Sequence, residues 1–166
     1  MKKISARFYC GIMASAMILG APLVAQADNH QGMDVPKIAA SVVLDGLDLP
    51  WDMAFLPDGT MFYTEKCRGL SVRTKDGTVH ALYGIEGTTG FADSGSDLFC
   101  EGQAGMLGVV PDRHFAKNRY LFVYSSSTKY HGDGCKTNFE KCDGNIVMRF
   151  TVSEDLKSVS DRTDIV

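Results

Sequence analysis

Short apolar stretches alternate with turn-forming residues along most of the chain. They predict strands at residues 42–44, 51–55, 61–64, 70–74 and 78–83, then at 106–110, 120–124 and 146–152, with a last short strand ending at Val166. After residue 27, no segment has the period of about 3.6 residues that is typical of an amphipathic helix. The pattern therefore predicts an all-β protein.

The predicted strands form two similar groups. Pro57-Asp58-Gly59 and Pro111-Asp112 each have the composition of a turn after a first strand, and the two aspartates lie 54 positions apart (58 and 112). A repeat of roughly 40 to 50 residues with four strands is typical of a β-propeller blade. Four such blades, about the smallest closed propeller, need about 216 residues, whereas 139 residues follow residue 27 of the 166. We therefore expect the N-terminal part of a longer propeller, with about its first two blades.

The N-terminal residues have the pattern of an export signal. Three basic residues precede an apolar stretch at 8–24, and small residues surround a cleavage site after Ala27. We interpret 1–27 as a signal peptide, 28–38 as a flexible lead-in and 39–166 as the truncated propeller domain. The expected location is periplasmic or secreted, and no other stretch has the ~20 apolar residues that would span a membrane.

Charge narrows the possible partners. The signal peptide contains three of the 17 basic residues and none of the 20 acidic ones, so the formal charge after cleavage falls from −3 to −6. Nucleic-acid binding needs a clustered basic surface, and so does binding to an anionic membrane. The sequence therefore predicts neither partner.

Four cysteines remain after cleavage: Cys67, Cys100, Cys135 and Cys142. An even number in an exported chain indicates disulfides, and three pairings are possible. Cys67–Cys100 with Cys135–Cys142 is the most local pairing. A zinc site is disfavoured, because the usual CxxC spacing is absent.

Blade topology places all four cysteines at one rim, together with Gln103. The connection between a blade's second and third strands lies at the same rim as the connection to the next blade. Long loops cross-linked at one face indicate either a mouth shaped for a ligand or bridges that only stabilise an exported protein.

Several chemistries find no support in the sequence. The Gly102–Gly105 turn lacks the GxGxxG spacing and the following helix of a nucleotide site, and no GxSxG segment provides a serine nucleophile. Asp93, Asp97 and Glu101 carry oxygen ligands suited to Ca²⁺, but without the spacing of an EF-hand loop. Nothing in the sequence brings two of the four histidines together: His30, His80, His114 and His131.

Three segments together resemble a known family. LPWDMAFLPDGTMFYTEKCRGLSVRTKDG, then GQAGMLGVV, then NRYLFVYSS are similar to the opening two blades of the soluble glucose/sorbosone dehydrogenases. These are exported six-bladed propellers that use pyrroloquinoline quinone (PQQ). The resemblance implies oxidation of the anomeric C1–OH of an aldose to a lactone, with electrons passing on to a cytochrome or quinone. It also implies a histidine base, hydride transfer from C1 to PQQ, and Ca²⁺ that polarises the quinone.

The resemblance gives Gln103 a role in substrate binding, because the family has a glutamine in the glycine-rich turn before its second blade. Its amide can donate to and accept from a sugar hydroxyl, where the glycines bring backbone towards the propeller axis. The alternative is a glutamine that caps its own loop. Relatives commonly carry a His-Pro-Asp-Phe type of turn after the first strand of the second blade. This sequence departs from that pattern, because it has Pro111-Asp112-Arg113-His114-Phe115 there.

The family's catalytic histidine, Ca²⁺ ligands and PQQ-binding arginines correspond to positions beyond Val166. We therefore assign no catalytic residue here and expect residues 1–166 alone to be inactive. The competing interpretation is a non-redox six-bladed propeller, either a Ca²⁺-dependent lactonase-like hydrolase or a carbohydrate-binding module.

Overall fold

The computed structural model describes residues 37–129 and 144–165. The chain divides into two compact units, residues 1–41 and residues 42–166, and every element below belongs to the second unit. The expected signal peptide (1–27) and most of the lead-in (28–38) lie outside the described residues. In the part of the chain that is described, no helix is both long and apolar enough to cross a bilayer.

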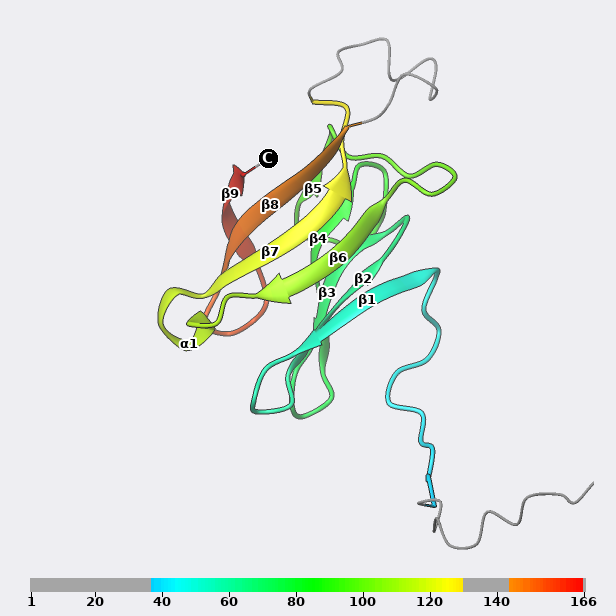
Figure 1. Cartoon of the computed structure of the whole chain (residues 1–166), viewed down its shortest axis with the longest axis vertical. Helices are drawn as coiled ribbons and strands as arrows, with labels where there is room; N and C mark the ends of the chain where they lie inside the picture. Colours follow the sequence, from blue (N-terminus) through cyan, green and yellow to red (C-terminus); the bar gives the residue numbers. More distant parts are fainter. Residues whose placement is uncertain (1–36, 130–143, 166) are drawn as a thin grey trace, which may run out of the picture. The chain divides into compact units, whose positions relative to one another are not determined.

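Two sheets make up the second unit (Figure 1). The first has the order β1-β2-β3-β4-β5, with strands Pro50–Phe55, Met61–Glu65, Gly69–Arg73, Val79–Ile85 and Ser94–Gly95. The second has the order β6-β7-β8-β9, with strands Met106–Pro111, Tyr120–Ser126, Asn145–Val152 and Val159–Asp164. Neighbouring strands are antiparallel except for β4 and the two-residue β5, which are parallel. The all-β prediction is confirmed.

Three details differ from the sequence prediction. Residues 42–44 form no strand: Val42 is 81% exposed and Val43 is 57% exposed, and β1 pairs with β2 but not with them. An apolar triplet alone does not make a strand, because a strand also needs hydrogen bonds to a partner strand, and residues 42–44 pair with none of the described strands. The last strand ends at Asp164 rather than Val166, and one helical turn, α1 (Phe115–Asn118), interrupts the connection from β6 to β7.

The two sheets repeat one hairpin. In the first sheet Phe55 pairs with Met61 across the Pro57-Asp58 turn, and in the second Pro111 pairs with Leu121. Both aspartates hold their turns in the same way. The Asp58 carboxylate accepts a hydrogen bond from the amide two residues later at 3.0 Å, and the Asp112 carboxylate does so at 2.7 Å. The repeated unit inferred from the two Pro-Asp turns is therefore present twice.

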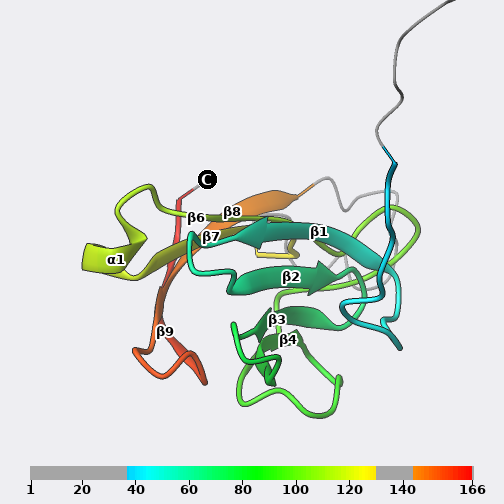
Figure 2. The same ribbon diagram turned by 90° about the horizontal axis from the view of Figure 1, so that it is seen from below.

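The core lies between the two sheets (Figure 2). Alternate residues of β8 point into it, as the sequence pattern predicts, so Ile146 is fully buried while Val147 is half-buried. The ring of Phe62 in β2 packs edge-on against the ring of Phe115 in α1, with the ring centroids 5.5 Å apart. This contact positions the helical turn against the first sheet. The apolar faces that meet here come from both sheets and include Leu70, Val72, Leu82, Met106, Val109, Leu121, Val123, Met148, Phe150 and Val152.

An irregularity in β6 is stabilised by the first sheet. The β6–β7 register shifts between Met106 and Val109, so the two residues between them have no partner in β7. The Asp52 carboxylate accepts the Val109 amide at 2.9 Å, and the Thr64 hydroxyl donates to the Leu107 carbonyl at 2.5 Å. These bonds satisfy backbone groups around the bulge and fix β6 beside β1.

A second link joins the outer parts of the sheets. The Arg162 guanidinium of β9 donates to both carboxylate oxygens of Asp97, at 2.7 and 2.6 Å, and to the Tyr83 hydroxyl of β4 at 3.1 Å. The Ser127 hydroxyl adds a third bond to Asp97 at 2.7 Å. Burial raises the pKa of Asp97, but the hydrogen bonds from Arg162 and Ser127 outweigh it, so the pKa lies below the usual value.

This link predicts a pH-dependent stability. Because folding lowers the pKa of Asp97, its stabilisation is complete above the unfolded pKa of about 3.9 and is lost as the pH falls through the lower folded pKa. The Asp97→Asn variant should lose about 1–2 kcal/mol of unfolding free energy at pH 7, a modest value because both partners are about a fifth exposed. Urea unfolding of both proteins at several pH values measures this. The difference should shrink in acid, and a constant difference would contradict the assignment.

Candidate functional site

The candidate site is the turn at Glu101–Gly105, which leads into β6. The Ala104 amide donates to the Glu101 carbonyl at 2.6 Å, so Gly102 and Gln103 occupy the two central positions of a β-turn. Gly102 has a φ of 51°, in the left-handed region that glycine adopts without strain. The sequence prediction that Gln103 lies on a turn before a strand is therefore correct.

Gly105 sits between the two sheets. A Cβ atom at this position would lie 2.4 Å from the carbonyl oxygen of Lys66, and φ is 155°. On the other side, the Gly105 carbonyl accepts the Ser126 amide at 2.9 Å and the Ser125 hydroxyl at 3.1 Å. The close backbone approach for which glycine is needed is thus to Lys66 of the first sheet, with β7 holding the opposite side.

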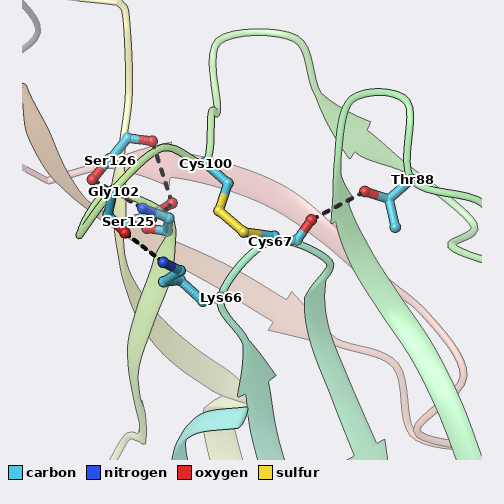
Figure 3. The surroundings of a disulfide bond; sticks show 8 residues. Lys66, Cys67, Thr88, Cys100, Gly102, Ser125 and Ser126 are labelled. Atoms are coloured by element: carbon cyan, nitrogen blue, oxygen red, sulfur yellow. Dashed lines mark hydrogen bonds between the residues drawn. A yellow bond between two sulfur atoms is a disulfide. The ribbon is translucent and has the colours of Figure 1, made fainter. Parts of the chain in front are cut away.

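A disulfide anchors the start of the same loop (Figure 3). Cys67, in the connection from β2 to β3, is joined to Cys100, and their Cα atoms are 5.1 Å apart. The Cys67 carbonyl also accepts the Thr88 hydroxyl at 3.4 Å. The expected second bridge, Cys135–Cys142, stays a prediction, because both residues lie outside the described part of the chain.

The Gln103 side chain is exposed on this anchored turn. Within residues 37–129 and 144–165, no side chain or backbone group forms a hydrogen bond with its amide. The loop-capping alternative would use this amide internally, and no such bond is present among these residues. The amide therefore retains a donor and an acceptor for a ligand.

The other candidate groups do not gather around Gln103. His80 lies in β4 and His114 precedes α1, on different sheets, while His30 and His131 lie outside the described residues. Both oxygens of Asp97 are bound to Arg162, so Asp97 does not face a cation with Asp93 and Glu101. Among the residues described, no group of three or more His, Cys, Asp or Glu side chains could hold a metal.

The part of the chain that the structure describes therefore offers no such cluster of ligands for calcium. A separate groove of about 450 Å³ is lined by residues of the two Pro-Asp turns and α1, including Phe55, Pro111 and Phe115. It lies at the end of β6 opposite Gln103, because Gln103 precedes Met106 and the groove begins at Pro111. The groove is therefore not part of the same site.

Comparison with known proteins decides the family. The family model described as Glucose / Sorbosone dehydrogenase matches residues 47–166, which cover both sheets. The chain belongs to this family. The resemblance carried by the three sequence segments is thus confirmed.

One relative is the aldose sugar dehydrogenase YliI of Escherichia coli, which is 28% identical to this chain over 124 residues. The match covers 75% of this chain and 29% of the relative. An uncharacterised Synechocystis protein is 36% identical over 97 residues, covering 57% of this chain and 23% of the relative. The chain thus spans less than a third of the length of these relatives.

Solved structures give the same picture for the fold. A glucose dehydrogenase matches 76% of this chain and 34% of its own, with 27% identity and a TM-score of 0.58. The apo form of the soluble aldose sugar dehydrogenase from E. coli matches 76% and 31%, with 28% identity and a TM-score of 0.55. The PQQ-bound aldose sugar dehydrogenase of Streptomyces coelicolor, 18% identical with a TM-score of 0.55, shows the likeness of fold. The two sheets are blades that match about a third of these propeller dehydrogenases.

Sequence reasoning missed the groups that support the turn. Lys66 contributes its carbonyl and its side chain, and the serine pair at 125–126 fixes Gly105 from β7. Neither the lysine before Cys67 nor the two serines at the end of β7 forms a distinctive sequence pattern. The glycines of the turn indicated a close backbone approach towards the propeller axis, but the approach of Gly105 to Lys66 was not predicted.

The disulfide should contribute strongly to stability. On the chain-entropy model, a bridge across 33 residues stabilises the fold by roughly 3–4 kcal/mol, so the Cys67→Ser/Cys100→Ser variant should lose about that much in urea unfolding without reductant. Under reducing conditions the variant and the parent should be equally stable, which serves as the control. Peptide mapping that instead links Cys67 to Cys135 or Cys142 would contradict this pairing.

Two glycines of the turn should respond differently to alanine. Gly105→Ala should cost about 3 kcal/mol in thermal unfolding, because its Cβ would overlap the Lys66 carbonyl. Gly102→Ala, with nothing within 4 Å of the added atom, should cost only about 1 kcal/mol for its positive φ. Equal losses would mean that Gly105 does not contact Lys66 closely.

Proposed function

We propose that these blades belong to a PQQ-dependent sugar dehydrogenase that oxidises the C1–OH of an aldose to the lactone. The observation that carries the proposal is the family match over residues 47–166. Aldose sugar dehydrogenase activity is named for the E. coli relative, and bound PQQ is named for the Streptomyces protein. The reaction removes two electrons and two protons from the sugar and reduces PQQ, which is reoxidised by an acceptor such as a cytochrome or quinone.

The contribution of these residues is substrate binding through Gln103. Its exposed amide stands on a turn held by the Cys67–Cys100 disulfide and by Gly105. Such an amide can donate to one sugar hydroxyl and accept from another. Because this chain covers less than a third of its relatives, a longer six-bladed protein would hold Ca²⁺ and PQQ with residues of other blades, and residues 1–166 alone are expected to be inactive.

The proposed location is the periplasm or the exterior of the cell. The signal-like pattern ending at Ala27 supports export. The Cys67–Cys100 bridge supports it independently, because disulfides persist in oxidising compartments and are rare in the cytosol.

The direct test uses the complete gene product, supplied with PQQ and Ca²⁺, and follows dye reduction by a panel of aldoses. Gln103→Ala should raise KM for the sugar about tenfold, the loss of roughly one hydrogen bond, without changing PQQ binding measured by absorbance. Glu101→Ala, a change on the same exposed turn, is the matched control and should leave KM near the parent value.

Other outcomes would identify the competing functions. Acid release from lactones without any electron acceptor would indicate a hydrolase, and sugar binding without turnover would indicate a carbohydrate-binding module. Absence of dye reduction across the whole panel would reject the dehydrogenase proposal.

A further inference from the structure

The β-turn that presents Gln103 leaves one peptide group unfixed by its own hydrogen bond. The bond from the Ala104 amide to the Glu101 carbonyl closes the turn but does not involve the Gly102 carbonyl. The peptide between the two central residues can adopt opposite orientations, and this difference separates the turn types. Such a flip would move Gln103, which is not among the residues with a positive φ, into the positive-φ region, at a cost of about 1–2 kcal/mol.

Lys66 supplies the bond that the turn lacks. Its ammonium donates to the Gly102 carbonyl at 2.5 Å, across 36 residues of sequence (Figure 3). A hydrogen bond from a charged donor is stronger than one between neutral groups. The bond holds the Gly102–Gln103 peptide in one orientation and so sets the direction in which the chain enters Gln103.

The backbone of Lys66 is itself firmly held. Its amide donates to the Leu49 carbonyl at 2.9 Å, and its carbonyl accepts the Met106 amide at 2.8 Å. Its side-chain stem lies against Gly105, with Cγ 2.5 Å from where an alanine Cβ would be. The ammonium therefore reaches the turn from a base that is fixed to both sheets.

The ammonium has no competing acidic partner among the described residues. The ion pairs found there involve other residues, and Lys66 is in none of them. A lysine whose charged group is only partly exposed would ordinarily point into water or pair with a carboxylate. Here it bonds to the one carbonyl that controls the turn.

We propose that Lys66 is a positioning residue for Gln103, acting through the Gly102 carbonyl. This inference rests on the proposed role of Gln103 in binding the sugar. Without the ammonium, only the cost of a positive φ at Gln103 opposes the flipped orientation, so the side-chain amide of Gln103 faces the sugar in a smaller fraction of molecules. The apparent affinity for the sugar then falls by that fraction.

The test uses three variants of the complete gene product. Lys66→Met keeps the stem that packs on Gly105 but removes the ammonium, Lys66→Arg keeps a charged donor, and Lys117→Met changes an exposed lysine on α1. Lys66→Met should raise KM for the aldose by up to about twofold with a smaller change in kcat, Lys66→Arg should restore most of the loss, and Lys117→Met should change neither.

Two further measurements separate positioning from a direct or purely structural role. Amide hydrogen exchange at residues 102–104 should be several-fold faster in Lys66→Met at an unchanged Tm. Combined with Gln103→Ala, Lys66→Met should add no further rise in KM, because both changes remove one function.

Each result has a distinct meaning. Unchanged exchange at the turn, or KM effects that multiply in the double variant, would overturn the positioning role. Faster exchange with unchanged KM in both the Lys66→Met and Gln103→Ala variants would support Lys66 as the anchor of the turn and reject the role of Gln103 in sugar binding.

Discussion

The packing of one sheet's face against the next is the interaction on which the rest of the structure depends. Phe62 and Val72 are fully buried because the second sheet covers them. Phe122 of β7 corresponds to Phe62 of β2. Phe62 follows Met61, which pairs with Phe55 across the first Pro-Asp turn, and Phe122 follows Leu121, which pairs with Pro111 across the second. Phe122 is only half-buried, and its neighbours Val110 and Tyr124 are 57% and 40% exposed. The second sheet therefore offers the same kind of face that the first sheet has already buried, as expected of consecutive blades in a ring.

This packing also creates the candidate site. The Glu101–Gly105 turn lies where the β2–β3 connection of one blade meets the first strand of the next, so its supports come from both. Cys67 and Lys66 hold it from the first blade, and Ser125 and Ser126 hold it from the second. Moving one sheet relative to the other would change the position of Gln103. The stability of the interface between the sheets and the geometry of the turn therefore depend on the same contacts.

The sequence predicted structure well where the local backbone alone determines which residue type is needed. Alternation in β8 and the two Pro-Asp turns follow from local backbone geometry, and both were predicted. It failed where the partner is remote: Val42 and Val43 look like a strand but pair with none of the described strands, and Arg162 meets Asp97 across 65 residues. The role of Gln103 was predicted from the family resemblance and stays a prediction, whereas Lys66 was not singled out, because a lysine near the surface has many ordinary roles.

The supports of the turn act through different terms of the free energy. The disulfide works mainly on the unfolded chain, by shortening the loops that it can explore, and so contributes stability without selecting an orientation for the Gly102–Gln103 peptide. Gly105 permits the approach of two backbones and its carbonyl is hydrogen-bonded to β7, but neither contact orients the Gly102–Gln103 peptide. The ammonium of Lys66 is the directional support among these, since it is bonded to the carbonyl whose orientation distinguishes one turn from another. A fold can therefore remain stable through its core and its bridge while a single hydrogen bond adds directional support to the turn that presents Gln103.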